Sequence, residues 1–360
     1  MENLAMNKFW ENRKVLITGH TGFKGSWLCL WLNQLGAIVS GMSLVEPVSS
    51  PDLFSVLDIN NSVNDYRGDI NHLDNCLNTL KKAEPEIIFH MAAQPLVRKS
   101  YADPLTTFRT NVMGTTNILQ GSIVCENVKS IVAITTDKCY ENIEDNYAYV
   151  ETDSLGGHDP YSSSKACAEH VASAYYRSFF KEKGVGLATA RSGNVIGGGD
   201  WSFDRLVPDA VRAWSRNERL ILRAPLSTRP WQHVLEPLSG YLTLAEKLWN
   251  EPDKFSGPWN FGPDYTSVKT VQEMVELAVQ IWGSPASWEV SSCNHPHESN
   301  LLQLNSGKAN SILGWIPRWD FGKAISETIH WYKSFYYNKQ NLLDMTLDQI
   351  NEYEDQIIRV

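Results

Sequence analysis

The sequence predicts an α/β fold in which a doubly wound parallel sheet carries helices on both faces. Short β-branched runs alternate with helical patterns along the first half, Gly36 and Gly184 each follow a helical pattern, and Asp159 with Pro160 supplies a helix cap and a first-turn proline. Apolar strands separated by helices are typical of a parallel sheet that is covered on both sides. With 360 residues, 42% of them hydrophobic, the chain can bury one large or two ordinary cores.

The elements follow in order along the chain. Strands are expected over residues 14–19, 37–44, 86–93, 130–136 and 186–193. Helices are expected between them, over about residues 24–35, 70–82, 104–125 and 160–183. Later helices are expected near residues 206–215, 239–249 and 268–282, with an amphipathic stretch near the C-terminus. We therefore expect a sheet domain over residues 1–193 with a return segment near 234–258, and a smaller mixed α/β lobe over 194–233 and 259–360.

Composition excludes several classes of protein. The formal charge is 32 − 41 = −9 and no long run of Lys or Arg occurs, so neither nucleic acid nor an anionic membrane is an expected partner. The six cysteines form no C-x-x-C pair, which predicts no metal site and no disulfide framework. Without a signal-peptide pattern or a long apolar run, the protein is expected to be soluble and cytoplasmic.

A glycine-rich turn follows the first expected strand. Gly19, Gly22 and Gly25 stand between that strand and the first helix, in the spacing G-x-x-G-x-x-G. Such glycines let the backbone approach a pyrophosphate, whose charge then meets free N–H groups at the helix start. The turn therefore predicts a dinucleotide site. Ser43 stands where an acid is expected at the end of the second strand, so the choice between NAD and NADP is weakly determined.

Hydroxyl and charged groups gather directly after the strand expected at residues 130–136. Thr136, Asp137 and Lys138 lie at its carboxyl end, the edge where parallel sheets bind ligands. In a regular strand, Asp137 and Lys138 would point to opposite faces. Both side chains can serve one site only if the strand ends or bends at about Thr136, and we therefore expect that it does.

Tyr161 and Lys165 are four residues apart near the start of the fourth expected helix, so they share one face. A nearby ammonium favours the phenolate and can bring the pKa of a proton-accepting tyrosine toward working pH. The spacing recurs at Tyr265 and Lys269, where no cofactor signal adjoins it. Only the first pair is interpreted as catalytic.

Taken together, these motifs give the chain a family resemblance. The glycine turn, HMAAQPLV, Asn111, TTDKCY, YSSSK and RSGNVIGGGD resemble the extended short-chain dehydrogenase/reductase family, from Lys14 to about Asn305. The pattern of Thr136 and Asp137, followed by an acid–base residue and then a tyrosine, resembles the pattern found in the nucleotide-sugar 4,6-dehydratases of that family. Members acting on thymidine sugars and GDP-mannose carry glutamate in place of Lys138, and Asp-Lys resembles the members acting on CDP-glucose.

The resemblance implies a Rossmann-type fold, bound NAD and a nucleotide-sugar substrate. The implied reaction is oxidation at sugar carbon 4, loss of water across carbons 5 and 6, and reduction at carbon 6. Tyr161 would take the hydroxyl proton at carbon 4, supported by Lys165 and Thr136, while Lys138 and Asp137 would act as base and acid. Lys138 would need burial or neighbouring positive charge to be neutral part of the time, and Asp137 an apolar pocket that keeps it protonated.

The resemblance also assigns binding residues. Cofactor contacts are expected from Gly19, Thr21, Gly22, Phe23, Lys24, Gly25, Asp69, Ile70, Ala92, Ala93, Asn111, Tyr161 and Lys165. Substrate contacts are expected from Gln94, Asn194, Arg205, Leu206, Arg229, Asn260 and His295. Asp69 is nearly as well explained as the cap of the following helix, and an arginine fork suits bidentate contact with phosphate.

Finally, the resemblance implies a homodimer or tetramer in which residues 104–125 and 160–183 form a four-helix contact. The product would enter deoxysugar biosynthesis for surface polysaccharide, such as lipopolysaccharide. Three alternatives stay open: an epimerase or dehydrogenase of the same family, a 4,6-dehydratase for another nucleotide sugar, and a non-catalytic dinucleotide-binding sensor.

Overall fold

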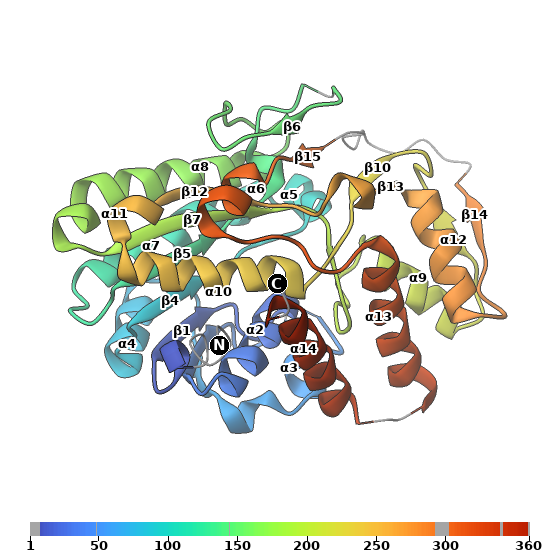
Figure 1. Ribbon diagram of the computed structural model, residues 1–360, viewed down its shortest axis with the longest axis horizontal. Helices are drawn as coiled ribbons and strands as arrows, with labels where there is room; N and C mark the ends of the chain where they lie inside the picture. Colours follow the sequence, from blue (N-terminus) through green and yellow to red (C-terminus); the bar gives the residue numbers. More distant parts are fainter. Residues whose placement is uncertain (1–7, 48, 144, 292–301, 339–340, 359–360) are drawn as a thin grey trace.

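A seven-stranded, wholly parallel sheet forms the centre of the computed structural model (Figure 1). The structure describes residues 8–47, 49–143, 145–291, 302–338 and 341–358. The strand order is β12-β7-β5-β4-β1-β2-β3. Its strands are β1 (Lys14–Thr18), β2 (Ile38–Ser43), β3 (Asn64–Arg67), β4 (Ile87–His90), β5 (Ser130–Ile134), β7 (Gly186–Ser192) and β12 (Gly257–Phe261). The predicted doubly wound sheet is confirmed.

Helices cover both faces of the sheet (Figure 1). The two layers are α4 (Leu73–Ala83), α7 (Thr115–Ile123) and α8 (Pro160–Tyr175) on one face, and α2 (Phe23–Gln34) and α10 (Leu235–Asn250) on the other. Successive strand residues enter different cores: Ile131 packs with the first layer and Val132 with the second. This double burial explains why the strands are continuous apolar runs.

The two long helices that the sequence predicts are each interrupted by a π-helical turn. Residues 104–125 form α6 (Pro104–Phe108), the π-helical turn η2 (Arg109–Gly114) and α7. Residues 160–183 form α8, the π-helical turn η4 (Tyr176–Phe180) and the 3-10 turn η5 (Lys181–Lys183). The start of α8 is as predicted, because the Asp159 carboxylate accepts from the Ser162 N–H at 3.0 Å and Pro160 stands in the first turn.

Two strands of the sheet lie outside the predicted set. Strand β3 has the polar sequence NDYR, and β12 begins with Gly257 and Pro258. Both stand at the edges of the sheet, where polar residues and proline are tolerated because one side of the strand is unpaired. Neither strand therefore carries the apolar run that marks the central five.

The remaining elements build the lobe and the connections. They are α3 (Leu53–Val56), η1 (Ile59–Ser62), α5 (Val97–Ala102), η3 (Asp137–Cys139), β6 (Ala148–Tyr149), β8 (Val195–Ile196), α9 (Leu206–Ser215), β9 (Leu220–Leu222), β10 (Thr228–Pro230), β11 (Gln232–His233), α11 (Pro252–Phe255), η6 (Tyr265–Ser267), β13 (Val268–Thr270), α12 (Val271–Trp282), β14 (Trp288–Val290), β15 (Gln303–Leu304), η7 (Ala309–Leu313), α13 (Phe321–Lys333), η8 (Ser334–Asn338) and α14 (Leu342–Ile358). The helix expected at residues 268–282 begins three residues late, because Thr270 and Glu273 form a capping box.

One hydrophobic cluster joins the sheet to the lobe. It contains Val132 of β5 and Leu238 of α10 together with Met274 of α12 and Ile329 of α13. Strand β12 carries the chain back into the sheet as far as Phe261. The division into two domains stays a prediction. No helix in the described ranges is long and apolar enough to cross a membrane.

The C-terminal helix α14 packs against α2 and α13 (Figure 1). A buried carboxylate helps to hold it: Glu236 of α10 accepts from the Tyr353 hydroxyl at 2.6 Å and from the backbone N–H groups of Arg318 and Trp319 at 3.0 and 2.6 Å. Burial raises the pKa of Glu236 to about 7. The carboxylate therefore links α10, the segment before α13 and α14.

The change Glu236→Gln is expected to flatten the dependence of stability on pH. Because the pKa of Glu236 in the folded protein, about 7, lies above its ordinary 4.5, the folded state holds an extra proton between these values. The contribution of Glu236 to the free energy of unfolding therefore falls by about 2 kcal/mol as pH rises from about 5 to about 7. Urea unfolding at both pH values measures this fall, and an equal fall in the variant would contradict the assignment.

Candidate active site

The glycine turn forms a cradle at the start of helix α2. Gly19 has a φ of +76°, and a Cβ there would lie 2.8 Å from the backbone N of Ala92. A Cβ on Gly25 would lie 2.3 Å from the Gly19 oxygen. Gly22 is the N-cap residue of α2 and, as a glycine, has no side chain that could accept from the first N–H groups of the helix. An α-helix leaves its first N–H groups without partners inside the helix, so the start of α2 at Phe23 fits the pyrophosphate of a dinucleotide.

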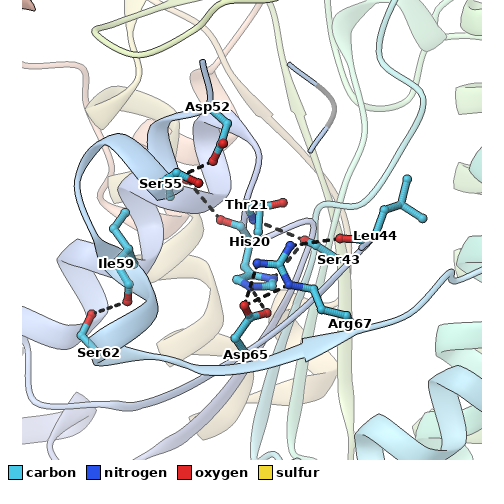
Figure 2. A network of polar contacts seen from close by, with 11 residues as sticks. His20, Thr21, Ser43, Leu44, Asp52, Ser55, Ile59, Ser62, Asp65 and Arg67 are labelled. Atoms are coloured by element: carbon cyan, nitrogen blue, oxygen red, sulfur yellow. Dashed lines mark hydrogen bonds and ion pairs between the residues drawn. The ribbon is translucent and has the colours of Figure 1, made fainter. Parts of the chain in front are cut away.

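A polar network lies beside this turn at the ends of β2 and β3 (Figure 2). The Ser43 hydroxyl accepts from the Thr21 N–H at 3.3 Å and meets the His20 Nδ1 at 3.0 Å. The other His20 nitrogen meets Asp65 at 3.0 Å, and Arg67 pairs with Asp65 at 2.6 Å. The network therefore contains a carboxylate, that of Asp65, on β3. This strand pairs with β2, which ends at Ser43, where an acid was expected.

The residues expected on the adenine side of the cradle lie after β3 and β4. The Asp69 carboxylate accepts from the Asn71 N–H at 2.9 Å, so it caps the turn before α4 and not α4 itself. Ile70 is buried, and a Cβ on Gly114 would lie 2.5 Å from it. Ala92 and Ala93 are half-buried directly after β4.

Asn111, on the π-helical turn η2, ties together three segments of the site. Its amide accepts from the Gln94 N–H at 2.8 Å and donates to the Gln94 carbonyl at 3.1 Å and to Ser164 of α8 at 2.9 Å. Asn111 is buried, so its side chain holds the loop after β4 against α8. The geometry gives it a structural role beside the expected cofactor contact.

Strand β5 ends at Ile134, and the chain then turns. Residues 137–139 form the 3-10 turn η3, which Thr136 caps by accepting from the Lys138 N–H at 3.3 Å. The expected end of the strand near Thr136 is confirmed. Because of this turn, Asp137 and Lys138 do not alternate across the sheet as strand residues would.

Asp137 is buried with one oxygen unpaired. Its Oδ1 accepts from the Thr136 hydroxyl at 3.0 Å, whereas Oδ2 has no hydrogen-bond partner among the described residues. A Cβ on Gly193 would lie 2.7 Å from that oxygen, so Gly193 leaves room for the carboxyl. Burial raises the pKa of Asp137, against the opposing charges of Lys138 and Arg229. Such a carboxyl can hold and donate a proton. Lys138 is only half-buried, so the burial expected for it is partial.

Tyr161 and Lys165 stand on α8 beside this turn, both buried. The Lys165 ammonium donates to the Ile134 carbonyl at 3.0 Å, and burial lowers its pKa to about 8. Burial raises the pKa of Tyr161 to about 12, while a hydrogen bond with the Thr136 side chain and the charge of Arg205 act in the opposite direction. In the protein alone the pKa of Tyr161 is therefore raised and not lowered, because burial outweighs the Thr136 hydrogen bond and the charge of Arg205.

Lys24 brings a further cation close to Lys165 and Arg205. Its ammonium donates to the Ser192 hydroxyl at 2.9 Å and lies over the Tyr241 ring at 5.8 Å. Burial, together with the charges of Arg205 and Lys165, lowers the pKa of Lys24 to about 7. The first helix thus contributes a titratable side chain as well as backbone N–H groups.

The expected substrate residues divide into two groups. Arg205 pairs with Asp200 at 2.9 Å, and Arg229 lies on β10. Their charges act on Tyr161 and Asp137 respectively, so both guanidinium groups lie near the side chains that are expected to be catalytic. Asn194 and Leu206 are half-buried near them, after β7 and at the start of α9.

Two other expected substrate residues are structural in this geometry. Asn260 is fully buried; its amide accepts from Tyr140 at 2.8 Å and donates to the Tyr149 carbonyl at 2.9 Å. The Gln94 amide bonds to Leu96 in its own loop and to Thr107 of α6. These bonds give both amides a structural role, and their contact with a substrate stays a prediction. His295 lies outside the described residues.

A buried set of residues behind the turn was not among the expected site residues. Glu169, one turn after Lys165, pairs with Arg191 of β7 at 2.8 Å, and Arg191 donates to the Tyr140 hydroxyl at 2.6 Å. Glu169 is the sequence feature that could have indicated this set, because a carboxylate four residues after a buried lysine on one helix face needs a partner of its own. The identity of that partner depends on the tertiary fold.

The glycine cradle and the buried tyrosine–lysine pair on a parallel sheet define the class: an enzyme of the extended short-chain dehydrogenase/reductase type. The chain belongs to the GDP-mannose 4,6 dehydratase family, whose model matches residues 16–328.

Comparisons with individual proteins agree with this family. The chain is 48% identical over 350 residues to the CDP-glucose 4,6-dehydratase of Salmonella typhimurium, covering 96% of this chain and 97% of that protein. It is 28% identical over 329 residues to the dTDP-glucose 4,6-dehydratase of Streptomyces antibioticus, covering 89% and 92%. A solved dTDP-glucose 4,6-dehydratase of Streptomyces venezuelae with NAD bound has a TM-score of 0.76 at 23% identity, over 91% of this chain and 99% of that one.

The change Gly25→Ala is expected to weaken NAD binding by about tenfold or more. Its Cβ would displace the Gly19 carbonyl, so the cradle would lose at least one charge-assisted hydrogen bond. Titration calorimetry measures the affinity. Gly322→Ala is the matched control, because a Cβ there makes only an ordinary 3.5 Å contact. Equal affinities in the two variants would contradict the cradle.

Proposed function

We propose that the protein converts CDP-D-glucose to CDP-4-dehydro-6-deoxy-D-glucose with NAD as a recycled hydride store. When bound, NAD would supply the hydride chemistry, accepting a hydride from sugar carbon 4 and returning it to carbon 6. The glycine cradle at Gly19, Gly22 and Gly25 would hold its pyrophosphate. The cytidine nucleotide is supported by 48% identity to the Salmonella enzyme.

Tyr161 is the base for the first proton. It would take the proton of the carbon 4 hydroxyl as the carbonyl forms there, and the Thr136 side chain would support the oxygen. Lys165 contributes positive charge behind the phenol while the Ile134 carbonyl fixes its ammonium. The raised pKa of Tyr161 in the protein alone means that substrate and cofactor must complete its activation.

Asp137 and Lys138 would carry out the loss of water. The new carbonyl at carbon 4 acidifies the proton at carbon 5, and Lys138 would remove that proton as Asp137 gives one to the departing hydroxyl at carbon 6. The electron pair of the broken C–H bond forms the double bond between carbons 5 and 6, and water leaves. After hydride reaches carbon 6, a proton returns to carbon 5.

The unpaired carboxyl oxygen of Asp137 is the observation that carries this proposal. A simple epimerase or dehydrogenase needs no acid at this place, and a sensor needs no buried Tyr161. A carboxyl with a raised pKa, beside a lysine on one short turn and next to the tyrosine–lysine pair, has both groups that an elimination requires.

The assembly is part of the same proposal. The stretch from α6 to the end of α7 exposes Leu105 of α6, Met113 of η2 and Val124 directly after α7, and the turn η4 after α8 exposes Phe179. These apolar side chains favour a homodimer, or a tetramer, through a four-helix contact. A role in deoxysugar supply for surface polysaccharide, in the cytoplasm, is consistent with a nucleotide-sugar substrate.

Deuterium labelling tests the reaction. CDP-glucose carrying deuterium at carbon 4 is expected to lose water and keep the label at carbon 6, which mass spectrometry of the product detects. Retention of water would reject the dehydratase in favour of an epimerase or dehydrogenase. Parallel incubations with UDP-, dTDP- and GDP-sugars report whether cytidine is the preferred base.

The change Lys138→Met is expected to slow water loss by about 10²- to 10⁴-fold, because the base for carbon 5 is removed. Oxidation at carbon 4 should persist, so the absorbance of reduced cofactor is expected to rise and stay. Lys254→Met, on the exposed helix α11, is the matched control. Unchanged water loss in Lys138→Met would refute the assigned role.

A further inference from the structure

The η3 turn that carries Asp137 and Lys138 is held at both ends by one buried ion pair. Before the turn, the Thr135 hydroxyl donates to Glu169 Oε1 at 2.5 Å. After the turn, the Tyr140 hydroxyl accepts from Arg191 Nη1 at 2.6 Å, and the guanidinium lies 4.8 Å from the Tyr140 ring centre. Glu169 and Arg191 join these two ends through bonds of 2.8 and 2.9 Å.

This ion pair is buried to an unusual degree. Its side chains are 2% and 4% exposed, and Thr189 gives the carboxylate a further bond at 2.6 Å. Burying two charges costs several kcal/mol, and an apolar pair of similar size is often at least as stable. Stability alone is therefore a poor explanation for Glu169 and Arg191. Their two parallel hydrogen bonds fix the orientation of the two side chains, because the planar Arg191 guanidinium meets both oxygens of the Glu169 carboxylate in only one arrangement.

The pair also connects the two halves of the proposed chemistry. Glu169 lies one helical turn after Lys165 on α8, the helix that carries Tyr161. Arg191 lies on β7, and its Tyr140 contact continues to Asn260 of β12 at 2.8 Å. The turn that carries the groups proposed for elimination is thus bonded to α8, the helix that carries the groups proposed for oxidation.

We propose that Glu169 and Arg191 are positioning residues for the loss of water, with Thr135 and Tyr140 as the two points at which they hold the turn. This inference rests on the proposed function for its catalytic consequence. A displacement of about 1 Å in a reacting group can cost on the order of 100-fold in rate, so a loosened turn would slow elimination while oxidation, which uses Tyr161, continues.

Two matched pairs of variants test the proposal. Thr135→Val and Thr189→Val each remove one hydroxyl bond to Glu169, but only Thr135 adjoins the turn. Tyr140→Phe and Tyr353→Phe each remove a buried tyrosine hydroxyl from its partner, but Tyr353 bonds Glu236, in a contact that does not involve the turn. The second member of each pair controls for the loss of a buried hydrogen bond as such.

Hydrogen exchange provides a measurement that needs no turnover. Peptides covering residues 135–141 are expected to exchange about tenfold faster in Thr135→Val and Tyr140→Phe, and within about twofold of the natural protein in Thr189→Val and Tyr353→Phe. Equal exchange in all four variants would overturn the proposal. If the natural protein fails to turn over CDP-glucose, the proposed function falls, whereas this measurement still judges the positioning.

Single-turnover kinetics with CDP-glucose and NAD provide the second measurement. In Thr135→Val and Tyr140→Phe, water loss is expected to slow by about 10- to 100-fold, while the rate of cofactor reduction changes by less than about threefold. The two control variants should keep both rates. An equal fall of both rates in Thr135→Val and Tyr140→Phe would show general loosening of the fold and would overturn the proposal.

Discussion

The hydrogen bond from the Lys165 ammonium to the Ile134 carbonyl fixes helix α8 against the end of strand β5. Every group proposed for catalysis depends on this junction, because Tyr161 stands on the helix and Asp137 follows the strand. A lysine can be buried there because the carbonyl at a strand end needs a donor and Glu169 supplies compensating charge. One contact between backbone and side chain thus joins the helix that carries Tyr161 to the strand that leads into Asp137.

Much of the fold could be predicted from the sequence because its signals are local. The five central strands are apolar runs, and the cap at Asp159 with Pro160 is a pattern of adjacent residues. The edge strands β3 and β12 could not be predicted, since their pairing depends on neighbours far along the chain. The π-helical turns were missed for a related reason: helical periodicity continues through them, and only tertiary contacts such as that of Asn111 with Ser164 distinguish them.

The site shows the same division between local and distant causes. The turn after Thr136 could be predicted because side chains alternate along a regular strand, which would separate Asp137 from Lys138. The burial of Asp137 could be predicted because this residue directly follows an apolar run. Gln94 and Asn260 were expected to meet a substrate because the family resemblance implies it. Their internal bonds cross 13 and 120 residues of chain respectively, which no local pattern reveals.

The π-helical turn η2 has a consequence for how this part of the chain can vary in length. It fits an extra residue into one turn, and Asn111 depends on that register to reach both Gln94 and Ser164. Deleting one residue from this stretch would restore ordinary helix geometry yet rotate the amide away from its partners. Natural insertions and deletions should therefore be confined to the surface connections, leaving this irregular stretch constant in length.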